Sequence, residues 1–171
     1  MQHNQTEELG TCSVGKLLFK LAVPAIAAQI INLLYNLVDR MYIGHIADVG
    51  KLALTGVGVC LPLIMIISAF AALVSMGGAP RASIFLGKGE KDNAEKTLGN
   101  SFTLLVMISI TLTIIFLLFS KDLLLLFGAS ENTIEYATSY MKIYSLGTIF
   151  VQLTLGLNAF ISAQGFAKTS M

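Results

Sequence analysis

One acidic side chain, Asp39, stands at the end of a stretch that could cross a membrane. It follows the uncharged residues 21–38, which read LAVPAIAAQIINLLYNLV. About 20 apolar residues suffice for a helix to span the hydrocarbon core. A carboxylate at the centre of such a helix costs about 2.5–3.5 kcal/mol to insert and is rarely without a function. Asp39 therefore predicts cation exchange across the membrane, the alternative being an interfacial acid paired with Arg40.

Polar side chains that precede Asp39 share one face of this predicted helix. At about 100° per residue they fall within an arc of roughly 120°, and Ile30, Leu34 and Leu37 fall opposite. One side would then face lipid, and the other would face protein or water. The asparagines could instead bond to a neighbouring helix. The residues predicted to line a cavity on this face are Gln29, Asn32, Tyr35 and Asn36.

A second predicted helix, over residues 133–163, carries a similar face of small and polar groups. This pattern is compatible with a cavity wall or with a tight seam between helices. Two tyrosines near the start of the helix could also belong to an aromatic belt at the membrane surface. The face consists of Tyr140, Tyr144, Gly147, Val151, Thr154, Asn158 and Ser162, of which Tyr144 and Thr154 are predicted to line the cavity.

The other residues that could do chemistry form no recognisable catalytic or metal-binding set. His3 and His45 lack metal-ligand spacing, and no Ser/His/Asp or Cys/His combination is plausible. Cys12 and Cys60 predict no disulfide framework. The net charge of +1, without a basic stripe, argues against binding to nucleic acid. The sequence predicts neither an enzyme nor a cofactor.

The composition indicates which kind of secondary structure holds these side chains. Of 171 residues, 55% are hydrophobic and 12% are charged, about half the charge of a soluble domain. Uncharged runs separate the charges, and each run is long enough to span a membrane. We therefore predict an all-α integral membrane protein with helices over 21–44, 52–79, 97–120 and 133–163.

The segments between these helices predict the topology. Residues 1–13 read as a disordered cytoplasmic tail, residues 14–20 as an interfacial lead-in, and residues 81–96 as the largest cytoplasmic loop. We expect a kink or a packing notch near Pro62, an N-cap at Ser130 or Thr133, and no single Ser/Thr stripe on the third helix. Lys and Arg are more frequent on cytoplasmic segments. A cytoplasmic N-terminus puts Lys16, Lys20, Arg81, Lys88, Lys91, Lys96 and Lys168 inside, against Arg40, Lys51, Lys121 and Lys142 outside.

Several stretches together resemble one family, the multidrug and toxic compound extrusion (MATE) transporters. The resemblance covers nearly everything after residue 13, and the order and spacing of the stretches carry it. They are YNLVDRMYIG at 35–44, LALTGVGVCLP at 52–62, GKGEKDNAEKTLGNS at 87–101, LFGASENTIEYATSYMKIYSLG at 126–147 and NAFISAQGFAKTSM at 158–171.

The resemblance implies about twelve helices in two six-helix lobes around a central cavity. Residues 14–171 would form the first four helices of the N-lobe, so we expect a fragment of a longer transporter. It also implies that Asp39 takes part in proton or sodium coupling, with Na⁺ at Asp39 as one possibility. Tyr140 and Asn158 would belong to the same polar network. The fifth-helix partners of that network have no counterpart here.

The expected function is a cation-coupled antiporter that exports amphipathic, often cationic, drugs across the plasma (inner) membrane. Its expected partners are these small molecules, the bilayer and the remainder of the transporter. A lipid-linked oligosaccharide flippase is one alternative, but its pyrophosphate headgroup would call for mid-membrane cations, which these helices lack. A non-transporting membrane subunit is another.

Overall fold

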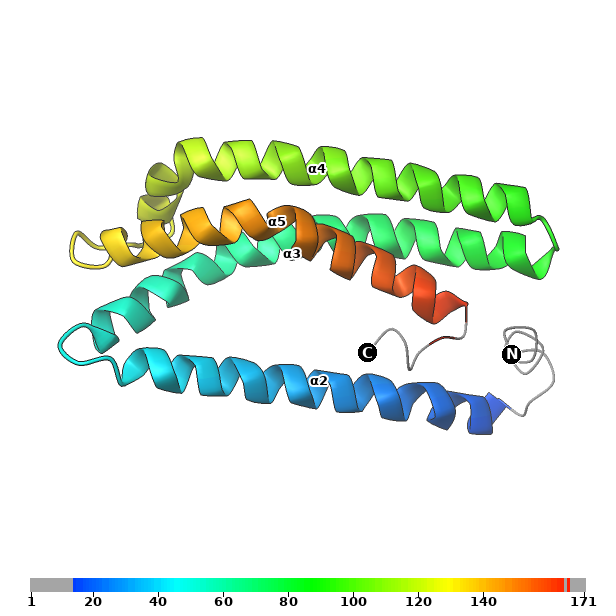
Figure 1. Cartoon of the computed structure of the whole chain (residues 1–171), viewed down its shortest axis with the longest axis horizontal. Coiled ribbons are helices and arrows are strands. Elements are labelled where there is room, and N and C mark those ends of the chain that lie inside the picture. The colour runs from blue at the N-terminus through cyan, green and yellow to red at the C-terminus, as the bar shows by residue number, and fades with distance from the viewer. Residues whose placement is uncertain (1–13, 165, 167–171) are drawn as a thin grey trace.

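Four long helices make up the fold. The computed structural model describes residues 14–164 and 166, so the predicted tail at 1–13 lies outside the described residues. The helices are α2 (Val14–Gly44), α3 (Gly50–Gly87), α4 (Lys91–Leu126) and α5 (Ile134–Ala163), and no strand occurs among the described residues (Figure 1). All four are long and apolar enough to cross a membrane. The predicted all-α membrane fold is therefore confirmed.

The helices on either side of the predicted 81–96 loop are longer than expected. α3 continues through Pro80 to Gly87 and α4 begins at Lys91, so the connection is only residues 88–90. The prediction of a long loop is wrong because it ended each helix at the first charge. The 38 residues of α3 extend about 57 Å, well beyond a hydrocarbon core of about 30 Å. Arg81 is the first charge after the apolar run of α3, but the helix continues for six residues beyond it.

Smaller differences concern the other helix boundaries. α2 includes the predicted lead-in from Val14, and α4 extends to Leu126. α3 contains Pro62, and the helix bends in its first half (Figure 1). Before α5 the N-cap residue is Thr133, whose Oγ1 accepts a hydrogen bond from the Ser130 amide at 3.0 Å.

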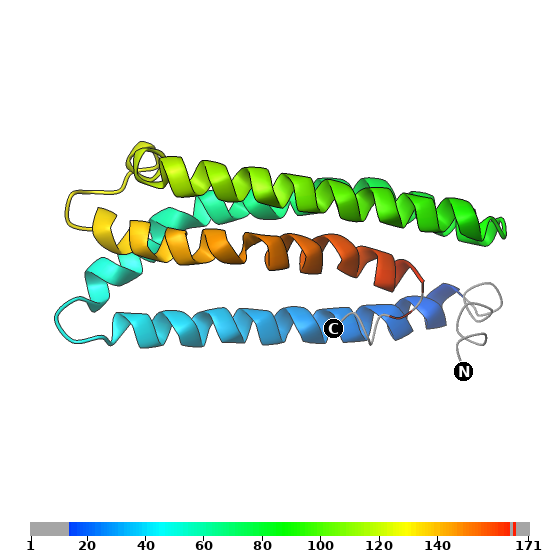
Figure 2. The same ribbon diagram turned by 45° about the horizontal axis from the view of Figure 1, so that its top comes forward.

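α3, α4 and α5 pack side by side as a three-helix bundle (Figures 1 and 2). Small residues allow close approach at each seam, as expected where van der Waals packing drives association in lipid. Gly56 of α3 faces the backbone of α5 near Ala137, and Gly156 of α5 faces the side chain of Leu105 on α4. The largest core cluster contains Cys60, Leu63, Ile67, Leu112, Phe116, Leu124, Ala129, Ala137 and Met141.

α4 does have a polar stripe in its seam, contrary to the expectation. Ser101, Ser109 and Ser120 are buried, whereas Thr103 and Thr111 are exposed. Each of these threonines donates its hydroxyl hydrogen bond to the carbonyl four residues earlier, at 3.0 and 2.9 Å. The prediction failed because it treated serine and threonine together, whereas on α4 these serines are buried in the seam and these threonines are exposed.

α2 stands apart from this bundle. Residues 29–42 are all exposed, and none of the 18-residue apolar window of α2 is buried. α2 joins α3 through a turn in which Asp48 adopts a left-handed conformation, with φ 65°. Both views show α2 running beside α3–α5 as a separate rod (Figures 1 and 2). Most of its surface is therefore free to face another element or lipid.

Candidate functional site

Tyr140 of α5 lies within electrostatic range of Asp39 of α2. Asp39 is exposed, near the end of α2 at Gly44. Asp39, Tyr35 and Arg40 all lie close enough to Tyr140 to interact with it electrostatically. Among the described residues, no ion pair links Asp39 to Arg40. Two of the predicted site residues, Asp39 and Tyr35, thus lie within electrostatic range of a third, Tyr140, although roughly 100 residues of sequence separate them from it. That the three act as one site stays a prediction.

Tyr140 is held in place by its neighbours on α5. Its ring stacks on that of Tyr144, with centroids 6.2 Å apart and an interplanar angle of 21°. Both rings are half-buried and pack against the largest core cluster. An aromatic pair of this kind contributes about 0.5–1.5 kcal/mol beyond the burial of its area. The Tyr144 ring and the core cluster therefore hold the Tyr140 ring in a defined position.

The face of α5 predicted to line a cavity differs from the face that packs in the bundle. The seam carries Met141, Ser145 and Gln152, all fully buried. The predicted face lies roughly a third of a turn away around the helix. On it Thr154 is exposed, and a Cβ on Gly147 would meet no atom within 4 Å. This face is therefore only partly covered, since Tyr140, Tyr144 and Val151 pack against the edge of the largest core cluster.

The remaining predicted residues do not join the Asp39–Tyr140 pair. Asn158 lies on the same continuous helix as Tyr140 but about 27 Å further along it, too far for one ion to touch both. Gln29 and Asn32 are exposed on α2, earlier in the chain than Asp39. The Asn36 amide donates to the Asn32 carbonyl of its own helix, at 2.8 Å. A role for these residues in a cavity stays a prediction.

The sequence analysis missed Gln152, the largest of the fully buried polar side chains among the described residues. Its side chain is fully buried, and its Nε2 donates to the Ile67 carbonyl of α3 at 2.8 Å. Its Oε1 has no partner among the described residues. The signal was a second row of mostly small or polar residues four or three apart, about a third of a turn from the face that was predicted to line a cavity. The row is Ala137, Met141, Ser145, Thr148, Gln152 and Gly156.

Oxygen atoms dominate the chemistry available at the Asp39–Tyr140 pair. A carboxylate and a phenol can together hold a proton or an alkali cation, which prefers oxygen ligands. No group of three His, Cys, Asp or Glu residues gathers within the described ranges. The arrangement is therefore compatible with transient cation binding by one carboxylate.

Comparisons with known proteins point to transporters of several bacteria. The multidrug export protein MepA of Staphylococcus haemolyticus is 26% identical over 161 residues, which are 93% of this chain and 35% of MepA. The "Probable multidrug resistance protein NorM" of Thermotoga maritima is 25% identical, covering 92% of this chain and 33% of NorM. The chain therefore spans about a third of the length of the curated relatives it matches.

A solved structure with a similar fold and a family model both point to the same kind of protein as these relatives. The structure superposes on a crystal structure of a MATE mutant with a TM-score of 0.85 and 23% identity, covering 95% of this chain and 36% of the other. That likeness supports the arrangement of the four helices. The MatE family model matches residues 24–171, which include α3, α4, α5 and most of α2. These helices are a multi-pass membrane unit, and the chain belongs to the MatE family.

Proposed function

We propose that these helices form part of a cation-coupled antiporter that exports amphipathic drugs, with Asp39 as the cation-exchange site. The proposal rests on the placement of Asp39, an acid on a helix long and apolar enough to span a membrane, within electrostatic range of Tyr140 of α5. The names of the relatives, which are multidrug export and resistance proteins, support the substrate class. The coupling ion is a proton or Na⁺.

The mechanism follows from the way α2 is held. A cation bound at Asp39 neutralises the carboxylate and so lowers the cost of placing it beside apolar groups. α2 has almost no packing of its own to lose when it shifts against α5. A ligand shifts two conformations only through its different affinity for each. Binding and release at Asp39 would therefore bias how α2 sits against the α3–α5 bundle.

The membrane and the orientation are also part of the proposal. We place the protein in the plasma (inner) membrane with its N-terminus in the cytoplasm, supported by the seven-to-four distribution of Lys and Arg. In this orientation the α3–α4 turn is cytoplasmic, and the α2–α3 and α4–α5 turns are external. The rest of the transporter would supply the other walls of the cavity.

Transport by an Asp39→Asn variant tests the exchange site. The complete transporter is reconstituted in vesicles, and uptake of a fluorescent cationic dye is followed under an imposed proton or sodium gradient. We expect Asp39→Asn to insert normally but to lose gradient-dependent uptake, because the amide carries no charge to be neutralised. Asp48→Asn is the matched control, since Asp48 lies in the α2–α3 turn and asparagine tolerates its positive φ.

Tyr140→Phe distinguishes the Asp39–Tyr140 pair from Asp39 acting alone. Loss of the hydroxyl should weaken coupling while leaving the stacked ring against Tyr144 in place. Gradient-dependent uptake that is unchanged in a well-inserted Asp39→Asn variant would overturn the proposal. Equal losses in Asp39→Asn and Asp48→Asn would do the same, because the effect would then not belong to the site.

A further inference from the structure

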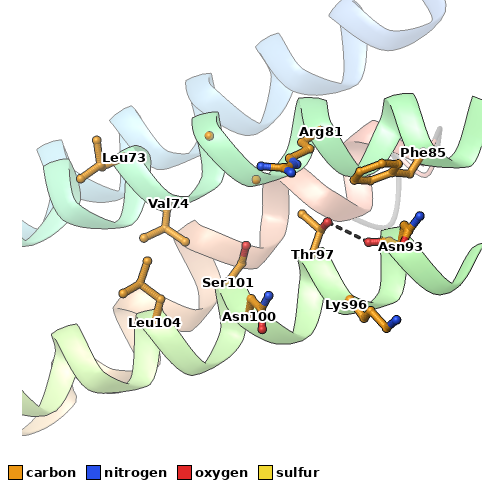
Figure 3. A pocket seen from close by; sticks show the side chains of 12 residues that line it. Leu73, Val74, Arg81, Phe85, Asn93, Lys96, Thr97, Asn100, Ser101 and Leu104 are labelled. Atoms are coloured by element: carbon orange, nitrogen blue, oxygen red, sulfur yellow. Dashed lines mark hydrogen bonds between the residues drawn. The ribbon is translucent and has the colours of Figure 1, made fainter.

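A cleft of about 490 Å³ lies between the second half of α3 and the first half of α4 (Figure 3). It is built by these two helices alone and is distinct from the Asp39–Tyr140 pair. Its lining changes character along its length. Leu73, Val74 and Leu104 form one end, and Arg81 and Lys96 belong to the other.

The polar end offers hydrogen-bond donors to an anion. Arg81, Lys96, Asn100 and Ser101 line it, and no partner of their side-chain donors is found within the described part of the chain. No carboxylate is among the lining residues. The Arg81 guanidinium lies 5.7 Å from the centroid of the Phe85 ring, a cation–π contact that helps to hold it. An Arg fork and a Lys ammonium are the side chains that recognise phosphate.

The apolar end has room for a hydrocarbon chain. Gly77 lines the cleft, and a Cβ at that position would meet no atom within 4 Å. Gly78, also in the lining, has no such freedom, because its Cβ would lie 2.5 Å from Cζ of Phe160. The wall at Gly77 is thus open, and that at Gly78 is closed by packing with α5.

The depth of the cleft matches the two parts of a lipid. Arg81 is the first charge after the apolar run of α3, and Lys96 is the last charge before that of α4. Both therefore mark the edge of the hydrocarbon core, where phosphates lie, while Leu73 and Leu104 lie deeper. Basic pockets between transmembrane helices at this depth bind anionic headgroups.

We propose that this cleft binds an anionic glycerophospholipid. Its phosphate would lie between Arg81 and Lys96, and one acyl chain would run past Gly77 over Leu73 and Leu104. This inference rests on α3 and α4 only and is independent of cation-coupled transport.

Native mass spectrometry of the protein released from detergent tests the site. The protein is titrated with phosphatidylglycerol or with phosphatidylcholine, and the ratio of lipid-bound to free protein is measured. We expect preferential retention of phosphatidylglycerol, reduced about fivefold by Arg81→Gln or Lys96→Gln alone and about 25-fold by both. The matched control is Lys88→Gln with Lys91→Gln, at the same end of the bundle but outside this cleft.

Two further arms identify the occupant. Gly77→Leu leaves the cations intact but fills the acyl path, so it should reduce phosphatidylglycerol retention, whereas Gly99→Leu on exposed α4 surface should not. Millimolar inorganic phosphate should fail to displace the lipid. Equal retention of the two lipids, equal losses in the control pair, or displacement by free phosphate would overturn the proposal. So would a photo-reactive group at Leu104 that captures a second protein chain in place of lipid.

Discussion

Adding one methyl group at Gly56 should loosen the seam between α3 and α5. An alanine Cβ there would lie 3.1 Å from the Ala137 nitrogen and 3.2 Å from the Thr133 carbonyl oxygen. Both are backbone atoms, which cannot rotate away as a side chain could. The two helices must therefore separate by a few tenths of an ångström, and overpacking of this kind costs about 1–3 kcal/mol.

Gly58 provides the comparison within the same helix. A Cβ at Gly58 would meet no atom within 4 Å. Both Gly→Ala changes gain about 1 kcal/mol of helix propensity, so that gain cancels between them. The Gly56→Ala protein should consequently be about 1–3 kcal/mol less stable at the seam than Gly58→Ala. This difference corresponds to a 5- to 150-fold change in the equilibrium for opening.

The rate at which Cys60 reacts with a thiol reagent measures how often the α3–α5 seam opens, because Cys60 is buried in that seam. Its thiol is fully buried and donates to the Ala137 carbonyl at 3.4 Å, one helical turn from Gly56. The chain has two cysteines, so Cys12→Ser leaves Cys60 as the only thiol to react with a maleimide. In detergent micelles, Gly56→Ala should be labelled 5- to 150-fold faster than Gly58→Ala. Equal rates would refute the reasoning, because the seam would then accommodate the methyl group without separating.

Three further predictions use other positions. Gln152→Leu should change the free energy of unfolding by less than about 1 kcal/mol in a denaturant titration, because it removes the unpartnered buried Oε1 together with the hydrogen bond to Ile67. If the free energy of unfolding fell by more than about 2 kcal/mol, Oε1 would have to be hydrogen-bonded in the protein. Gly128→Ala, at φ 96°, should cost about 1–2 kcal/mol of stability, whereas Gly99→Ala, in the interior of α4 and without strain, should gain about 1 kcal/mol from helix propensity. For topology, an impermeant thiol reagent outside the cell should label Gly128→Cys and not Gly89→Cys, and the reverse pattern would invert the proposed orientation.

The number of spans could be predicted from the sequence because charges are excluded from hydrocarbon. The same rule misplaced the helix ends around the α3–α4 turn. Arg81 and Lys96 are costly inside the membrane but entirely compatible with helix in water, so a charge locates the membrane surface and not the last helical residue. Helix length beyond the bilayer depends on local backbone bonding, which hydropathy does not record.

The site was predictable only in part, for a different reason. A helical wheel groups Asp39 with Tyr35, and the continuous helix α2 keeps both positions on one face. The position of Tyr140 near Asp39 and Tyr35 depends on how α5 packs relative to α2. No pattern within either helix predicts that packing. The burial of Gln152 was missed for the same reason, because the seam it joins is defined by close contact with Ile67 of α3.

Because α2 packs so little against α3–α5, its two ends can move by different amounts. With 31 residues, α2 is a lever arm of about 46 Å whose pivot is the turn after Gly44, where Asp48 holds its positive φ. A rotation of about 10° there would sweep the far end of the helix by roughly 8 Å, yet would shift Asp39, about 8 Å from the pivot, by only about 1 Å. Asp39 could thus stay within electrostatic reach of Tyr140 while α2 swings away from α5 at the opposite end. Because the acid lies near the pivot, the distance between Asp39 and the Tyr140 phenol would change little during a motion that is large at the other end of α2.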